Sequence, residues 1–176
     1  MSAQPPDAAK RGFHVVVSTE RFTLPSGREL VLDIVKHPGA AAIVPFISDT
    51  DILLIRQYRH ATRDTILEVP AGKIDPGESP LQTAARELEE EVGQRAGRIE
   101  ALGWIWTTPG FTDEKIHLYA GFDLEASHSR HEDDEIIEAF RIPLDRALEL
   151  IWRGELTDAK SALTLIHAAR RLGRLA

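Results

Sequence analysis

Along much of the chain, apolar residues recur at the two-residue spacing of β-strands. Between Phe13 and Val35, short β-prone runs flank the turn Pro25-Ser26-Gly27, which predicts an antiparallel meander. Apolar runs at 40–47 and 52–58, separated by the polar stretch 48–51, suggest a hairpin. Further candidate strands cover residues 65–69, 99–106, 116–124 and 137–141.

Apolar residues at helical spacing predict helices over residues 79–93, 144–153 and 161–172. In the first segment Ser79 is a natural N-cap, Gln82 completes a capping box, and Gly93 is a natural stop. A core-facing stripe at helical spacing is formed by Leu81, Ala84, Ala85, Leu88 and Val92. Mixed strands with a few helices indicate an α/β or α+β sandwich.

The first predicted helix carries a block of carboxylates. Glu87, Glu90 and Glu91 stand at i, i+3 and i+4, so they project from one face and repel each other. A divalent cation such as Mg²⁺ turns this repulsion into ligation, because it binds carboxylates together with substrate phosphates. A solvated acidic face is the usual alternative for a run of charge. The fixed glycines and the caps at both helix ends favour the metal site.

The segment from Gly72 to Gln94 resembles the Nudix box, a glycine-containing loop followed by a helix with an Arg-Glu and a Glu-Glu pair. The matching residues are Gly72, Glu78, Arg86, Glu87, Leu88, Glu90, Glu91 and Gly93. Gln94 departs from the pattern, because an aliphatic residue is usual there. The resemblance implies an α/β fold, namely an α/β/α sandwich with a mixed sheet over residues 37–176. Residues 1–36 then supply a flexible lead and an additional N-terminal antiparallel sheet.

The same resemblance implies hydrolysis of a diphosphate by water with the help of metal ions. Two or more Mg²⁺ or Mn²⁺ ions would be held by Glu87, Glu90 and Glu91, with the backbone carbonyl of Ala71 as a further ligand. Arg86 would hold Glu90 in its ligating position, and Glu78 would brace the loop. Glu89, at the free position of the pattern, is expected to be solvated surface.

Two flanking segments resemble the ADP-ribose and nucleoside diphosphate sugar pyrophosphatases. These are Leu67–Gly72 and Thr108–Glu114, the second containing Pro109 about fifteen residues beyond the box. An ordinary Pro-Gly turn is the alternative explanation of Pro109. The resemblance implies cleavage of ADP-ribose to AMP and ribose 5-phosphate. Two alternatives stay open: hydrolysis of other nucleoside diphosphate sugars such as GDP-mannose, and a non-catalytic module that senses a nucleotide.

Substrate contacts are expected outside the box. Arg56 and Arg59 resemble the arginines beside the diphosphate, and strand alternation allows one of them to face the site, with Arg59 the better match. Glu114 would reach toward the metals or the terminal ribose. Phe22, or a tryptophan such as Trp106, would offer the base a stacking face. The alternatives are surface ion pairs for the arginines and core positions for the aromatic residues.

The residue that activates water remains open. The acidic stretch His131–Glu135 lies where the subgroup often carries a catalytic glutamate, so Glu135 and then Glu132 are the first candidates, followed by Glu90 and Glu114. Such a base must lie within hydrogen-bond reach of the proton that it removes, and only geometry selects among them. A solvated turn explains the acidic stretch equally well.

Composition narrows the class of protein. The 176 residues fit one domain, the absence of cysteine excludes thiolate chemistry, and a net charge of −7 argues against nucleic-acid binding. Neither a secretory signal nor an apolar run of about 20 residues is found, so we expect a cytoplasmic protein without membrane contact. The N-terminal meander has few obvious partners of its own, so we expect a homodimer whose pocket the meander helps to form.

Overall fold

The computed structural model describes residues 16–129 and 136–175 of the chain. Within these residues no helix is long and apolar enough to cross a membrane. The strands and helices, in chain order, are β1 (Val16–Thr23), β2 (Glu29–Lys36), β3 (Ala40–Pro45), β4 (Asp51–Arg59), β5 (Asp64–Glu68), β6 (Ala71–Lys73), α1 (Pro80–Val92), β7 (Gln94–Trp106), β8 (Lys115–Ala126), β9 (Ile137–Pro143), α2 (Leu144–Trp152) and α3 (Ala159–Arg171).

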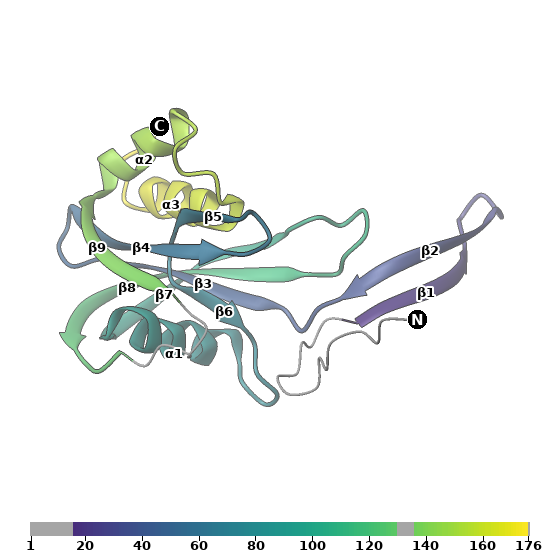
Figure 1. Ribbon diagram of the computed structural model, residues 1–176, viewed down its shortest axis with the longest axis horizontal. Coiled ribbons are helices and arrows are strands. Elements are labelled where there is room, and N and C mark those ends of the chain that lie inside the picture. Colours follow the sequence, from purple (N-terminus) through teal and green to yellow (C-terminus); the bar gives the residue numbers. More distant parts are fainter. Residues whose placement is uncertain (1–15, 130–135, 176) are drawn as a thin grey trace, which may run out of the picture.

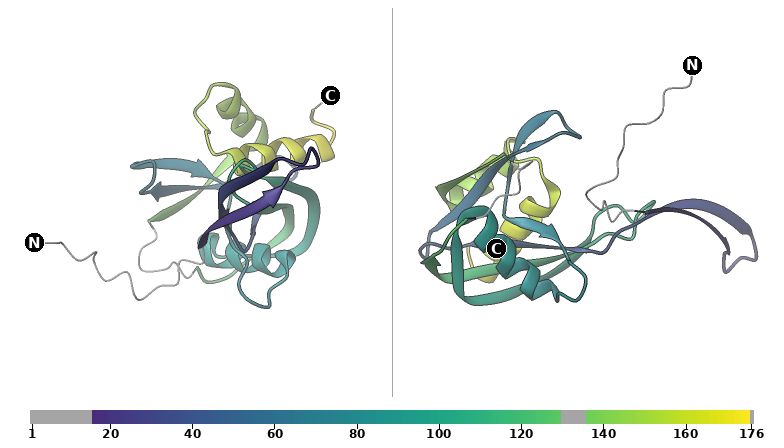
Figure 2. Two further views of the ribbon diagram at one scale, coloured as in Figure 1. Left: turned by 90° about the vertical axis from the view of Figure 1, so that its right-hand side faces the viewer. Right: turned by 60° about the horizontal axis from the view of Figure 1, so that its bottom comes forward.

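The body of the molecule is a three-layer sandwich (Figure 1). A mixed four-stranded sheet has the order β6-β3-β8-β7, in which β3 and β8 run parallel. An antiparallel three-stranded sheet has the order β5-β4-β9. Helix α1 lies on one side of the strands, while α2 and α3 lie on the other, as Figure 2 also shows. The predicted α/β/α sandwich with a mixed sheet is therefore confirmed.

Strand β3 is the centre of the fold because both of its faces are buried. Ala42 and Val44 belong to the main core, which includes apolar residues of α2 and α3. Ala41 and Ile43 face the opposite way, into a smaller core with Leu88 of α1. A strand that is apolar on both faces must be covered by helices on both sides. The sequence of β3 thus fixes α1 against one face of the sheet.

The predicted hairpin between residues 40–47 and 52–58 is wrong. Strands β3 and β4 lie in different sheets, and an isolated bridge between Phe46 and Ile52 joins them. The reason is the burial of β3, which takes β6 and β8 as its neighbours and leaves β4 to pair with β5 and β9. Strand β7 also starts earlier than predicted, directly after the left-handed Gly93 (φ 63°) that ends α1.

The capping of α1 follows the sequence. Ser79 Oγ accepts from the Gln82 backbone N–H at 3.3 Å, and the Ser79 N–H donates to Gln82 Oε1 at 2.8 Å. One residue of the predicted core stripe is misplaced, because Leu81 is 47% exposed. In this first turn Thr83 is buried instead, and its hydroxyl donates to Glu78 Oε2. The Thr83 side chain therefore joins the first turn of α1 to the loop before the helix.

The N-terminal sheet is a single hairpin of β1 and β2, joined by a turn at Gly27 (φ 81°). It projects from the body, as Figure 1 and the right-hand view of Figure 2 show. At its base, the Val35 N–H donates to the Phe111 carbonyl, and the His37 N–H donates to the Asp113 carboxylate. Apolar side chains of both strands are exposed, including Val17 near the base and Val31 nearer the turn. The predicted additional antiparallel sheet is confirmed as two long strands.

Candidate active site

The loop before α1 and the helix itself meet at Gly72. A β-carbon at this position would lie 1.8 Å from Oε1 of Glu87, well inside van der Waals contact. Glycine is therefore required here because the Glu87 carboxylate occupies the space of a side chain. The glycine of the loop and the first carboxylate of the helix thus form one unit, although fifteen residues of the chain separate them.

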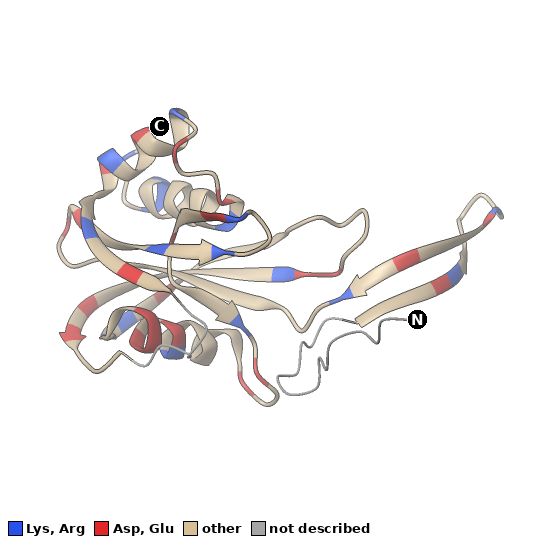
Figure 3. Ribbon diagram, viewed as in Figure 1, with Lys and Arg blue, Asp and Glu red and all other residues tan. Residues whose placement is uncertain are grey.

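Arg86 gathers the carboxylates on this side of α1, where Figure 3 shows acidic positions grouped on the helix. Its Nη1 donates to Glu87 Oε1 at 2.7 Å and to Glu90 Oε2 at 2.8 Å, and its Nε donates to Glu78 Oε1 at 3.0 Å. Burial alone would lower the pKa of Arg86, but Glu78, Glu87 and Glu90 together raise it. The same bond from Arg86 lowers the pKa of Glu78. Arg86 therefore holds two of the predicted ligands and the brace Glu78.

Glu91 differs from its neighbour Glu90. Both belong to the acidic face that the sequence predicts, yet Glu91 is buried, with 3% of its surface exposed. Its Oε2 accepts from the Ala71 backbone N–H at 3.0 Å, so β6 covers it. Glu90 is partly exposed at the edge of the helix. The expectation that Glu89 is solvated surface needs correction. Its carboxylate accepts hydrogen bonds from Arg95 and from the Ser127 hydroxyl.

The residues on α1 fit a divalent cation. Glu87 and Glu91 are buried, and buried carboxylates in proteins are paired or coordinate metals. Their oxygens, with those of Glu90, are the hard donors that Mg²⁺ prefers, and Gly72 leaves the room that Glu87 occupies. Among the described residues no three acidic or imidazole groups form a finished metal site. Arg86 occupies the place between Glu87 and Glu90.

The two candidate arginines of β4 point to different sides. Arg59 binds Glu68 through two bonds, from Nε to Oε1 at 2.7 Å and from Nη2 to Oε2 at 2.8 Å. The pKa of Arg59 is raised, first by its hydrogen bonds to Glu68 and to a smaller extent by the charge of Glu91. Arg56 is exposed, packs over the Phe140 ring at 4.1 Å and lies 3.4 Å from Glu138. Its contacts are those of a surface residue.

Three other predicted site residues lie elsewhere in the chain. Phe22 is on β1, in the hairpin that projects away from α1 (Figure 1). Trp106 is half exposed at the end of β7, with its ring edge-on to Trp104 at 5.5 Å. Glu114 accepts from the Thr107 hydroxyl at 2.9 Å and lies 3.5 Å from His37. The described contacts of these residues do not bring them to the carboxylates of α1.

The first candidates for water activation, Glu132 and Glu135, lie outside the described residues. The described chain resumes at Ile136, whose carbonyl accepts from the Tyr58 N–H at 3.3 Å. On the neighbouring residue, Gln57, the buried side-chain oxygen has no described hydrogen-bond partner.

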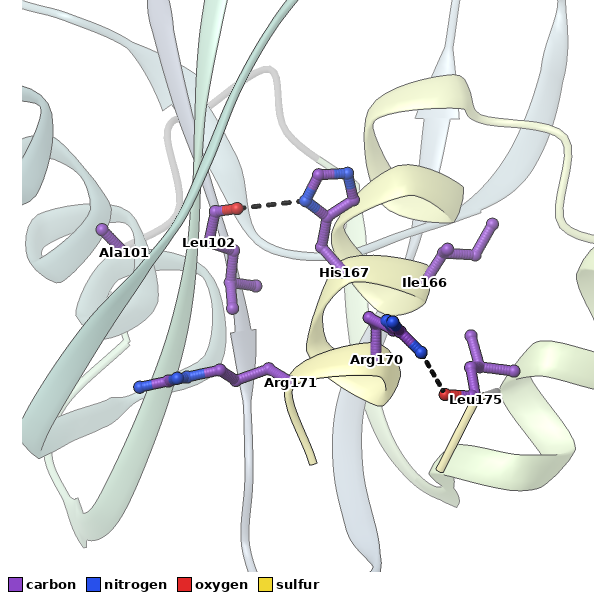
Figure 4. Close-up of a pocket in the computed structure, with 7 residues that line it drawn as sticks. All are labelled: Ala101, Leu102, Ile166, His167, Arg170, Arg171 and Leu175. Atoms are coloured by element: carbon purple, nitrogen blue, oxygen red, sulfur yellow. Dashed lines mark hydrogen bonds between the residues drawn. The ribbon is translucent and has the colours of Figure 1, made fainter. Parts of the chain in front are cut away.

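Hollows lie on both sides of the four-stranded sheet. One, of about 210 Å³, lies beside α1 and is lined by Arg86, Glu89, Glu90, Arg95 and His128. A larger one, of about 670 Å³, lies between β7 and α3 and is drawn in Figure 4. There the His167 ring meets the Leu102 carbonyl at 3.0 Å, and Arg170 binds the Leu175 carbonyl. Because α1 and its carboxylates lie on the other side of the sheet, the smaller hollow belongs to the candidate active site.

A glycine loop closed over helical carboxylates, with an arginine among them, is the kind of arrangement that can support cation-assisted chemistry on phosphates. The family model of the NUDIX domain matches residues 36–164 of the chain. The chain therefore belongs to this family. It is therefore a Nudix hydrolase that acts on pyrophosphate bonds.

Three known proteins are similar over most of their length. The chain is 38% identical to "ADP-ribose pyrophosphatase" of Bacillus subtilis (strain 168), covering 83% of this chain and 80% of the relative. It is 36% identical to "Methanol dehydrogenase activator" of Bacillus methanolicus, covering 86% and 83%. A solved structure described as "ADP compounds hydrolase" superposes with a TM-score of 0.81 at 26% identity, covering 95% of this chain and 92% of the other.

Proposed function

We infer that the protein hydrolyses the diphosphate of ADP-ribose, giving AMP and ribose 5-phosphate. The observation that carries this inference is the way the loop and Arg86 hold three carboxylates of one helix. Glu91 accepts from the Ala71 N–H, Glu87 packs against Gly72, and Arg86 donates to both Glu87 and Glu90. The names of the relatives, ADP-ribose pyrophosphatase and ADP compounds hydrolase, support the choice of substrate.

Glu87, Glu90, Glu91 and the carbonyl of Ala71 are the proposed ligands of two or more Mg²⁺ or Mn²⁺ ions. When bound, such ions neutralise charge on diphosphate oxygens and lower the pKa of a bound water. Arg86 contributes by holding Glu87 and Glu90 in fixed positions. Mutation of a residue that orients metal ligands typically lowers metal affinity or activity about 10- to 100-fold.

Arg59 is the proposed diphosphate-binding residue. Its Nε and Nη2 are bonded to Glu68, which leaves the Nη1 edge of the guanidinium for a phosphate oxygen. Arg56 is a second candidate with surface contacts. The proton of the attacking water would pass to Glu135 or Glu132, with Glu90 and Glu114 as further candidates. Glu114, Phe22 and Trp106 would contact the ribose or the base.

Other substrates use the same chemistry, and a panel of nucleotide sugars separates them. We expect phosphate release by a coupled phosphatase with ADP-ribose to exceed that with GDP-mannose, and to require Mg²⁺ or Mn²⁺. A preference for GDP-mannose would change the substrate but keep the mechanism. Absence of turnover with every compound, together with tight nucleotide binding, would support the non-catalytic sensor instead.

We also propose a homodimer in which residues 1–36 help to form the substrate pocket. The support is the projecting hairpin, since two-stranded hairpins are marginally stable alone and the apolar side chains of β1 and β2 are exposed. Exchange of this hairpin would place Phe22 in the partner's site. Light scattering tests the dimer, and a monomer mass contradicts it. A protein starting near His37 that stays monomeric and fully active would contradict the shared pocket. A cytoplasmic location remains a proposal.

A further inference from the structure

We propose that Glu68 and Lys160 are positioning residues, which hold the guanidinium of Arg59 so that its free edge faces the diphosphate. The proposal rests on the proposed function, because it assigns to Arg59 the binding of that diphosphate. Glu68 and Lys160 do not touch the substrate in this account. They act through Arg59, from β5 and from the first turn of α3.

Glu68 is the centre of this arrangement. Its side chain is 1% exposed, and both of its oxygens accept from Arg59 in a paired geometry. Burial alone would raise the pKa of Glu68, but Arg59 and Lys160 together lower it, so the carboxylate is ionised. A paired contact fixes the plane of the guanidinium as well as its position. The direction of the remaining N–H groups of Arg59 is therefore set by Glu68.

Lys160 fixes Glu68 in turn. Its Nζ donates to Glu68 Oε2 and, at 2.9 Å, to Asp158 Oδ2. Asp158 is also the N-cap of α3, because it accepts from the Ser161 N–H at 3.0 Å. The Ser161 hydroxyl accepts from the Val69 N–H at 2.9 Å, two residues before Ala71. The start of α3 thus holds both the partner of Arg59 and the chain that leads to the metal-binding loop.

Stability alone gives a weak reason for this cluster. Replacing a buried ion pair with well-packed apolar residues is often neutral or stabilising. The cluster pairs two carboxylates, Glu68 and Asp158, with two cations, Arg59 and Lys160, at the C-terminal end of β4. An arginine in that position is useful to a diphosphate only if its orientation is fixed, because a long side chain otherwise loses much of its binding energy to rotation.

The test compares Lys160→Met, Lys160→Arg, Arg59→Met and the double variant Arg59→Met/Lys160→Met. We would measure kcat and KM for ADP-ribose, and the Kd of AMP by calorimetry at saturating Mg²⁺. Lys160→Met should raise KM and Kd about tenfold, the loss expected for one misoriented charge-assisted bond, with kcat changed less than about threefold. Lys160→Arg should restore most of the loss. In the Arg59→Met background, Lys160→Met should add less than about twofold, because its effect passes through Arg59.

The control is Arg141→Met, which removes another ion pair of the same sheet, to Asp51 at the opposite end of β4. It should leave kcat, KM and Kd unchanged. If Lys160→Met fails to fold, Lys160→Gln replaces it in the same cycle. Unchanged KM and Kd in the Lys160 variants, or equal losses with and without Arg59, would overturn the proposal. If the effect of Lys160→Met on AMP binding depends on Arg59 as expected while the wild type does not cleave ADP-ribose, the proposed function fails and the positioning role stands.

Discussion

Two clusters of charged side chains, one on α1 and one around Arg59, are built in opposite ways. The α1 cluster, made of Glu78, Arg86, Glu87, Glu90 and Glu91, comes from one short segment of the chain. The bonds of Arg86 to Glu78 and Glu90 span eight and four residues. The Arg59 cluster, made of Arg59, Glu68, Asp158 and Lys160, joins three elements, and its Lys160–Glu68 bond spans 92 residues.

The charge balance of the two clusters also differs. The Arg59 cluster pairs two cations with two carboxylates, so it is closed and suited to holding a side chain in place. The α1 cluster gathers four carboxylates around or beside Arg86 and therefore keeps an excess of negative charge. Such an excess attracts further cations. The excess negative charge of the α1 cluster supports its proposed role in binding a metal, whereas the balanced charge of the Arg59 cluster supports its proposed role in orienting a protein side chain.

The largest expected effect comes from removing charge in the α1 cluster. Glu91→Gln keeps the size of the side chain and a bond to the Ala71 N–H, but it removes a proposed metal ligand. We predict a fall in kcat on the order of 100- to 1,000-fold with the fold retained. Glu90→Gln should behave alike, and its apo form should melt no lower than the wild type, because repulsion on the helix falls. Steady-state kinetics and thermal melting measure both. Wild-type turnover in either variant would remove that residue from the ligand set.

Gly72→Ala should lower turnover about 100-fold, because the added methyl group displaces the Glu87 carboxylate by more than the roughly 1 Å that a catalytic group tolerates. Stability should change little, since the group that must move is the end of a flexible side chain. A double variant sharpens this prediction. Glu87→Gln should cost much less activity in the Gly72→Ala background than in the wild type. Independent losses would mean that Gly72 acts in some other way.

Glu68→Gln tests the Arg59 cluster through its pH dependence. Near pH 7 we expect a loss of about 3 kcal/mol in the free energy of unfolding, because two cations lose a buried anionic partner. The folded-state pKa of Glu68 is lowered from 4.5, so its stabilisation is present above that value and is lost as the pH falls through the folded pKa. Urea unfolding across the acid range should therefore show the two proteins converging. A difference in the free energy of unfolding that stays constant at all pH values would contradict the assignment of the stabilisation to the Glu68 charge.

The smallest effect should come from the helix cap. Ser79→Ala removes the side-chain acceptor for the Gln82 N–H and should cost about 1 kcal/mol of stability. Activity should be unchanged once the protein is folded, since Ser79 touches none of the proposed ligands. Thermal melting and kinetics on the same sample check this. A loss of activity larger than the loss of stability would mean that the start of α1 adjusts the carboxylates.

The two clusters also explain how much the sequence can predict. Helix α1, its caps and the grouping of Glu87, Glu90 and Glu91 follow from spacing within one segment, because side chains three and four residues apart share a helix face. The burial of Glu91 does not follow, since it depends on β6 crossing above the helix. The role of Glu68 and Lys160 has no local pattern at all. Their contact depends on how the fold brings the last residue of β5 beside the first turn of α3.

The wrong hairpin has a similar cause. The turn between residues 48 and 51 is present, but the partners of β3 are chosen by its two buried faces. A continuous apolar run indicates a central strand, and that signal outweighs the nearby turn. Leu81 shows the limit of periodicity. The predicted apolar stripe extends into the first turn of α1, where the Leu81 side chain is exposed.

The most direct test of the account is product analysis of ADP-ribose treated with the purified protein, with added Mg²⁺ and with a chelator. The account predicts AMP and ribose 5-phosphate in equal amounts, formed only when the divalent cation is present and not formed by Glu90→Gln. Turnover that persists in the chelator and in Glu90→Gln would contradict it, because the chemistry would then not depend on the carboxylates of α1.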